Sequence, residues 1–137
     1  MCGICGFTFE DKKLLKSMTD LLTHRGPDEQ GTFNDKNISL GHRRLSIIDL
    51  KTGQQPMANE DETVWIVFNG EIYNYTDLKV ELEKKGHTFR TNSDTETIIH
   101  GYEEYGVDIV KHLNGCFAFA IWDTPQKKLF IARDRLG

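Results

Sequence analysis

The sequence predicts a domain of the α+β class, built from antiparallel strands and a few helices. Three segments place apolar residues at the three- and four-residue spacing of a helix that is buried on one side. Around them lie short runs rich in β-branched and aromatic residues, which favour strands. Several of these runs are joined by only a few turn residues, which is typical of antiparallel hairpins.

The first half of the chain contains one expected helix between two groups of strands. A strand over residues 4–9 is followed by Asp11, whose side chain can cap a helix. Residues 30–33 and 38–42, separated by the polar turn 34–37, are predicted to form a hairpin. The apolar stripe of the helix is expected to lie in the core, and it consists of Leu14, Leu15, Met18, Leu21 and Leu22.

The second half begins with an almost continuously apolar run at 64–68, as expected for a strand that is covered on both faces. We expect this strand to end in a tight turn at 69–71. A second helix is predicted over 75–82, and a capping box at 93–96 predicts the start of a third. The remaining expected elements are a short helical piece after Gly106 and two strands at 116–122 and 129–132.

Composition and charge exclude several classes of protein. A chain of 137 residues suits one domain with a hydrophobic core. Its formal net charge of −4 argues against a general surface for nucleic acid or anionic membranes. No apolar run approaches the length of a membrane span, and no signal-peptide pattern is present. Three cysteines make no disulfide framework, so we expect a reducing, cytoplasmic location.

The strongest chemical feature is Cys2, which directly follows the initiator methionine. Removal of Met1 leaves a residue that carries a thiol and a free α-amine, whose unperturbed pKa values are roughly 8.5 and 8. The amine can then act as general base for its own side chain, directly or through one water, so that no separate histidine is needed. Gly3 leaves room for a substrate close to the sulfur.

The same cysteine permits other interpretations. Cys2 and Cys5 form a C-x-x-C pair, which can indicate a redox site or half of a zinc site. A zinc site needs further ligands, and only Cys116 remains. His24 and His42 lack the spacing of metal ligands, so we assign them structural roles and predict no metal.

Three polar positions at strand ends and turns complete a hypothesis about the substrate. Asn69 and the backbone N–H of Gly70 can donate to an oxyanion, although Asn-Gly is also a common turn. Arg44 can bind a carboxylate or be a surface cation. Asp94 can bind an ammonium group or favour the first turn of its helix. An acyl carbon facing Cys2, a carboxylate and an ammonium group together describe glutamine or asparagine.

The chain resembles the glutaminase domain of class II glutamine amidotransferases, in particular that of glutamine-hydrolysing asparagine synthetases. The resemblance covers the whole chain, and its motifs occur in the order of the family. They are Met1-Cys2-Gly3-Ile4-Cys5-Gly6, His24-Arg25-Gly26-Pro27-Asp28, Arg44-Leu45-Ser46-Ile47-Ile48-Asp49, Phe68-Asn69-Gly70-Glu71-Ile72-Tyr73-Asn74, Ser93-Asp94-Thr95-Glu96, Gly115-Cys116-Phe117-Ala118-Phe119-Ala120-Ile121-Trp122-Asp123 and Arg133-Asp134-Arg135-Leu136-Gly137.

This resemblance implies an N-terminal-nucleophile (Ntn) hydrolase fold, a four-layer αββα sandwich around two antiparallel sheets. It implies that mature Cys2 attacks the side-chain amide of glutamine while its own α-amine moves the proton. Asn69 and the Gly70 amide would form the oxyanion hole. The products are ammonia and, after hydrolysis of a γ-glutamyl thioester, glutamate.

The resemblance also implies substrate contacts and partners. Arg44 would hold the α-carboxylate of glutamine, and Asp94 and Glu71 its α-ammonium group. Residues 1–137 would be the glutaminase domain and need no cofactor. In the complete enzyme the ammonia would reach a synthetase domain that activates aspartate with ATP and Mg²⁺ to make asparagine.

Two departures from the family pattern matter. The family continues beyond Gly137 into further strands, so we expect an incomplete glutaminase domain without its synthetase half. Such a segment is expected to be poorly stable or to complete its sheets as a homo-oligomer. In addition, the α-amine of Cys2 is blocked while Met1 is attached.

Two alternatives stay open from the sequence. The same glutaminase chemistry can feed another acceptor, such as a sugar or a secondary metabolite, because acceptor specificity would belong to the missing domain. The chain can also be a non-catalytic fragment that assembles with partners.

Overall fold

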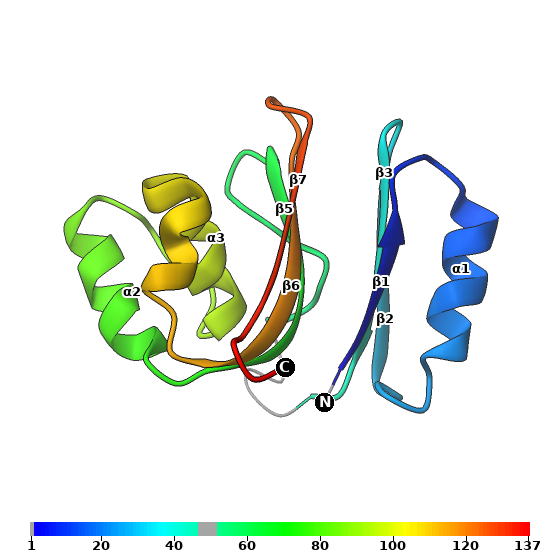
Figure 1. Ribbon diagram of the computed structural model, residues 1–137, viewed down its shortest axis with the longest axis horizontal. Coiled ribbons are helices and arrows are strands. Elements are labelled where there is room, and N and C mark those ends of the chain that lie inside the picture. The colour runs from blue at the N-terminus through cyan, green and yellow to red at the C-terminus, as the bar shows by residue number, and fades with distance from the viewer. Residues whose placement is uncertain (1, 47–51) are drawn as a thin grey trace.

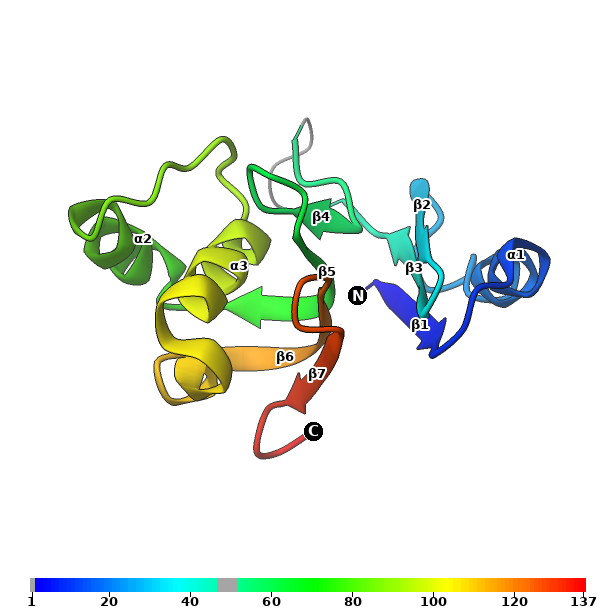
Figure 2. The same cartoon turned by 90° about the horizontal axis from the view of Figure 1, so that it is seen from above.

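The computed structural model describes residues 2–46 and 52–137, which form four layers (Figure 1). Helix α1 covers one sheet, a second sheet stacks on the other face of the first, and α2 and α3 cover the far side (Figures 1 and 2). The predicted αββα sandwich is therefore confirmed. In chain order the elements are β1 (Gly3–Phe7), α1 (Lys12–Leu21), β2 (Glu29–Asp35), β3 (Ile38–Arg44), β4 (Met57–Ala58), β5 (Val64–Ile72), α2 (Tyr75–Lys84), α3 (Asp94–Tyr105), the 3₁₀ helix η1 (Gly106–Lys111), β6 (Gly115–Asp123) and β7 (Lys128–Arg133).

All strand pairs in the two sheets are antiparallel, as the short connections predict. The small sheet has the order β1-β3-β2 and the larger sheet the order β4-β5-β6-β7. In the small sheet Gly3 pairs with Arg43. The beginning of β1 therefore lies beside the end of β3, and this register brings the N-terminal cysteine to the functional pocket described below.

Strand β5 is buried on both faces, as its apolar run predicts. Successive side chains of a strand point to opposite faces, and both faces of β5 carry core residues. Ile66 and Phe68 belong to the core that the larger sheet forms with α2 and α3. Val67 belongs to a second core between the two sheets, together with Ile38 and Trp122.

The expected apolar stripe of α1 is wrong in part. Leu15 is fully buried, but Leu14 and Leu21 are 41% and 77% exposed. A single helix on a three-stranded sheet buries only a narrow stripe, and Thr19 occupies the buried position one turn after Leu15. The Thr19 hydroxyl, which is also buried, donates to the carbonyl oxygen of Leu15 at 3.1 Å.

The third helix begins where predicted, but without a complete capping box. The side chain of Ser93 caps α3 by accepting a hydrogen bond from the N–H of Thr95. The carboxylate of Glu96 does not return to Ser93; it accepts hydrogen bonds from the backbone N–H groups of Arg90 (2.8 Å) and Thr91 (2.7 Å). Glu96 therefore fixes the loop before the helix rather than the cap itself. No helix within 2–46 or 52–137 is long and apolar enough to cross a membrane.

Two leucines of α1 provide a test of this packing. We expect Leu15→Ala to lower the free energy of unfolding by about 2–4 kcal/mol, because it leaves a cavity beneath the helix. Leu21→Ala removes an exposed side chain and should change that free energy by less than about 0.5 kcal/mol. Urea denaturation of both variants measures the difference, and equal losses would show that α1 is seated differently.

Candidate active site

One pocket, with a volume of about 140 Å³, collects residues from both sheets and from the start of α3. All six residues that the sequence singles out for catalysis or substrate binding line it. Their roles remain predictions, but their convergence from four separate segments is a property of the fold. The lining residues are Cys2, Arg44, Leu45, Gly53, Gln55, Phe68, Asn69, Gly70, Glu71, Ser93, Asp94, Thr95 and Cys116.

Cys2 is held at the pocket by the register of β1 with β3. It directly precedes β1, and its sulfur lies against the backbone of Leu45, the residue after β3. The N–H of Leu45 donates to Sγ of Cys2 at 3.4 Å, and Sγ lies 3.8 Å from the carbonyl oxygen of the same residue. The thiol is half-buried, so it is both fixed and accessible from the pocket.

The predicted turn at 69–71 is wrong, because β5 continues to Ile72. Asn69 pairs with Ala118 and Gly70 with Phe117 in the ladder with β6. Gly70 has a φ of +152°, and a Cβ at this position would lie 2.1 Å from the carbonyl oxygen of Cys116. The missing side chain thus lets β6 approach closely and keeps the strand intact.

The side chain of Asn69 brings an unsatisfied polar group to the pocket. Its Oδ1 atom is buried and has no hydrogen-bond partner among the described residues. A buried amide usually finds partners for its polar atoms. This oxygen can accept a hydrogen bond from a ligand, whereas an oxyanion would have to be bound by the Nδ2 group of the same amide.

Arg44 is a buried cation, which excludes the alternative of a surface charge. Only 4% of the residue is exposed, and Nη1 lies 3.0 Å from Oε2 of Glu29. Glu29 is its partner across the β2–β3 ladder, so the pairing follows from the strand register. A guanidinium fixed in this way keeps a positive charge at the pocket, which favours a carboxylate there.

The opposite charge comes from the start of α3. Asp94 is buried, and its Oδ2 atom accepts a hydrogen bond from the N–H of Ile72 at 3.0 Å. Burial raises the pKa of the Asp94 carboxyl, the hydrogen bond from Ile72 opposes this effect, and the nearby charge of Glu71 raises the pKa further. The two neighbouring acidic groups create a place where a cationic group is stabilised.

His24 and His42, to which the sequence analysis assigns structural roles, each contact a backbone carbonyl oxygen. His24 is exposed, and its Nδ1 atom lies 3.0 Å from the carbonyl oxygen of Leu21. His42 is buried in β3, and its Nε2 atom donates to the carbonyl oxygen of Phe68 at 3.2 Å. Because Phe68 directly precedes Asn69, this hydrogen bond ties the small sheet to the strand that carries the pocket amide.

Several pocket residues were missed from the sequence. Gln55 accepts a hydrogen bond from the N–H of Phe68 at 2.6 Å through Oε1 and lies 3.4 Å from Oγ1 of Thr95 through Nε2. It thus joins the loop before β4 to β5 and α3. Nothing in the sequence of this polar loop distinguishes Gln55 from its neighbours. Gly53 and Cys116 were missed for the same reason, since only the folded chain brings them here.

The C-x-x-C pair does not act as one unit. Cys2, Cys5 and Cys116 are all free thiols. The sulfur of Cys2 lies against Leu45, whereas that of Cys5 lies against Gly41 in the neighbouring strand. Burial raises the pKa of the Cys5 thiol, which makes it less reactive. Cys2 is therefore the cysteine of this pair that the pocket exposes.

An αββα sandwich whose first strand is preceded by a cysteine defines the class of Ntn hydrolases. Residues 1–137 match the model of the glutamine amidotransferase domain over their whole length, and the chain belongs to this family. The predicted resemblance is thereby confirmed.

Curated relatives are glutamine-hydrolysing asparagine synthetases. Asparagine synthetase 1 of Bacillus subtilis is 47% identical over 145 residues, a match that covers 100% of this chain and 23% of that protein. Asparagine synthetase 1 of Arabidopsis thaliana is 43% identical and is covered to 24% of its length. The chain thus spans about a quarter of these relatives.

Solved structures share the fold at lower sequence identity. The glutamine phosphoribosylpyrophosphate amidotransferase of B. subtilis, solved with ADP and GMP, matches 98% of this chain and 37% of its own with a TM-score of 0.75 at 19% identity. An allosteric regulatory enzyme of purine biosynthesis matches 75% of this chain and 24% of its own with a TM-score of 0.61 at 25% identity. The Ntn-hydrolase fold is therefore shared beyond the asparagine synthetases.

The burial of the His42 ring predicts how the free energy of unfolding depends on pH. Burial lowers the pKa of His42 to about 4; the hydrogen bond to Phe68 opposes this shift, and the charge of Arg44 adds to it. In the unfolded chain the ring titrates near 6.5. Its contribution is therefore complete above about pH 6.5 and is lost as the pH falls to about 4, by roughly 3 kcal/mol in all.

Urea denaturation at a series of pH values between 7 and 4 measures this loss. His42→Gln keeps a hydrogen-bond donor without a titrating ring, so its stability should fall less over the same interval. A variant that loses as much as the wild type would show that other groups cause the acid sensitivity.

Proposed function

We propose that this domain hydrolyses the side-chain amide of glutamine and releases ammonia. The observation that supports the proposal is that Cys2, Asn69 and Gly70 line one pocket. Membership of the glutamine amidotransferase family supports glutamine as the substrate.

In the proposed reaction the thiol of Cys2 adds to the amide carbon of glutamine. The proton of the thiol passes to the α-amine of the same residue, and the sulfur forms a bond to the carbon. The resulting oxyanion accepts hydrogen bonds from the amide of Asn69 and the N–H of Gly70, and donors of this kind contribute about 3 kcal/mol each in comparable sites. The α-amine then protonates the nitrogen that leaves as ammonia, and a γ-glutamyl thioester remains.

Water completes the proposed cycle. The α-amine removes a proton from a water molecule that adds to the thioester, and glutamate leaves as the sulfur regains its proton. The buried guanidinium of Arg44 would bind the α-carboxylate, and Asp94 with Glu71 would bind the α-ammonium group. No cofactor takes part in these steps.

We further propose that the ammonia serves the synthesis of asparagine from aspartate. The names of the curated relatives support this acceptor, and they favour it over a sugar or secondary metabolite. The complete relatives are about four times as long as this chain, and we propose that ATP and Mg²⁺ act in a synthetase domain outside residues 1–137.

Substitutions in the pocket test the proposed chemistry. Cys2→Ala should abolish glutamine hydrolysis, because it removes the sulfur that forms the thioester in the proposed reaction. Asn69→Ala should lower kcat by about 10²–10³-fold with little change in KM, because the lost donor acts on the oxyanion.

Asn37→Ala, in the exposed turn between β2 and β3, is the matched control and should leave the rate unchanged. Release of glutamate and ammonia measures the activity. Substantial turnover by Cys2→Ala, or a loss in Asn69→Ala that appears only in KM, would contradict the proposed roles.

The requirement for a free α-amine gives a separate prediction. Active protein should have the intact mass expected after loss of the initiator methionine. A fraction that retains Met1 should fold but not hydrolyse glutamine, because its amide nitrogen cannot accept the thiol proton. Mass spectrometry of chromatographically separated fractions, with the activity of each, makes the comparison, and full activity in a fraction that keeps Met1 would exclude the α-amine as the base.

A further inference from the structure

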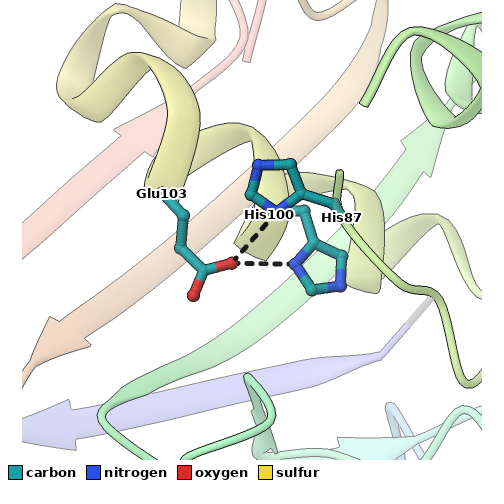
Figure 3. A group of neighbouring side chains, drawn as sticks. All are labelled: His87, His100 and Glu103. Carbon is teal, nitrogen blue, oxygen red and sulfur yellow. Dashed lines mark hydrogen bonds and ion pairs between the residues drawn. The ribbon is translucent and has the colours of Figure 1, made fainter. Parts of the chain in front are cut away.

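A second group of reactive side chains lies on α3 and in the segment before it. His87, His100 and Glu103 point toward one another (Figure 3), and one potential metal-binding atom of each lies within 4.8 Å of the others. His100 and Glu103 are three residues apart on α3 and therefore share a face of the helix. His87 comes from the segment between α2 and α3. None of the three lines the Cys2 pocket.

The distances in this cluster suit a common metal ion. Oε2 of Glu103 lies 2.8 Å from Nδ1 of His100 and 3.7 Å from Nδ1 of His87. Two atoms bound tetrahedrally to zinc at 2.0–2.1 Å are separated by about 3.4 Å. These two separations differ from that value by less than about 1 Å, and the ligand atoms of the two histidines lie within 4.8 Å of each other.

The ring nitrogens that would face away from a metal lie near carboxylates. Nε2 of His87 lies 3.4 Å from Oε2 of Glu104. Nε2 of His100 lies 3.5 Å from an oxygen of Glu96 and 3.5 Å from an oxygen of Glu60. Metal-binding histidines typically direct the second ring nitrogen to a carboxylate, which fixes the tautomer and the orientation of the ring.

The third member of the cluster is supported in the same way. Oε1 of Glu103 accepts a hydrogen bond from Nδ2 of Asn59 at 2.7 Å, which leaves Oε2 directed at the two histidines. His87 and Glu103 therefore each have an outer hydrogen-bond partner that orients the atom pointing inward, whereas the outer nitrogen of His100 lies near two carboxylates without a hydrogen bond among the described residues. Charged side chains that pair at a surface without binding a metal need no such outer hydrogen bonds.

The charge of the surroundings favours a cation at this point. His100 is only 1% exposed and has the carboxylates of Glu60, Glu96 and Glu103 around it. The cluster therefore stabilises a positive charge, which either a proton or a metal ion can provide.

We propose that His87, His100 and Glu103 form a site for a divalent transition-metal ion, with zinc as the ion that the ligands fit best. Two imidazole nitrogens and one carboxylate oxygen are ligands that zinc accepts in tetrahedral sites, and water can take the fourth position. The metal would fasten the α2–α3 connection to the buried helix α3, apart from the proposed glutaminase reaction.

Calorimetric titration of chelator-treated protein with zinc chloride tests the site. The three free thiols can also bind zinc, so the informative quantity is the difference between variants. We expect wild type to bind one more zinc ion than His87→Gln, or to bind it at least about 100-fold more tightly. His87 is chosen because it lies on a connecting segment and is partly exposed, so its replacement leaves the core in place.

His24→Gln is the matched control, since His24 is exposed and lies outside the cluster; it should bind zinc like wild type. Zinc should also raise the Tm of wild type and of His24→Gln but not that of His87→Gln, because a ligand of the native state stabilises it. Cobalt(II) at the same site should give the absorption of a four-coordinate ion without a thiolate charge-transfer band.

Equal zinc binding by wild type and His87→Gln would overturn the proposal. So would a rise in Tm that is the same in both, or a cobalt spectrum dominated by thiolate. In each case the cluster would be a protonated histidine held among carboxylates, with no metal.

Discussion

The candidate active site depends on the contact between the two sheets. Cys2 directly precedes the first strand of the small sheet, whereas Asn69 and Gly70 belong to the larger one. Among the described residues, no ladder hydrogen bonds join these two sheets. Their relative position rests on the apolar core between the sheets and on the hydrogen bond from His42 to Phe68. A shift of about 1 Å between reacting groups can cost 10²-fold in rate, so the fit of this core is a catalytic requirement in the proposed reaction.

The pocket contains two buried charged side chains of opposite sign, Arg44 and Asp94. Arg44 pairs with Glu29 across the β2–β3 ladder, while Asp94 is held by the N–H of Ile72 at the start of α3, and both residues line the pocket. Removing these groups from water is costly unless each has a partner. In the proposed reaction the carboxylate and the ammonium group of the substrate amino acid would add to the partners of these buried charges.

The hairpins, the helices and the family motifs were predictable from the sequence because each depends on neighbouring residues. The errors arose where tertiary contacts decide. Leu21 fits a helical stripe but is exposed, because only the packing of α1 on the sheet determines the width of the stripe. Gly70 has turn chemistry but continues a strand, and Glu96 serves the loop before α3 instead of its cap. The six named site residues could be proposed from chemistry and resemblance, whereas Gln55 enters the pocket by a long-range contact that no local pattern indicates.

The close approach of β6 to Gly70 has an evolutionary consequence. Any other residue at this position would collide with the backbone of Cys116. A substitution of Gly70 therefore disturbs the fold before it can alter the reaction rate. In the proposed reaction the donor at Gly70 is a main-chain N–H group. Its position depends on the backbone of β5 and not on the identity of a side chain. Diversification of substrate preference would therefore have to proceed through neighbours such as Arg44 or Asp94, while this amide stays the same in every descendant that keeps the sandwich.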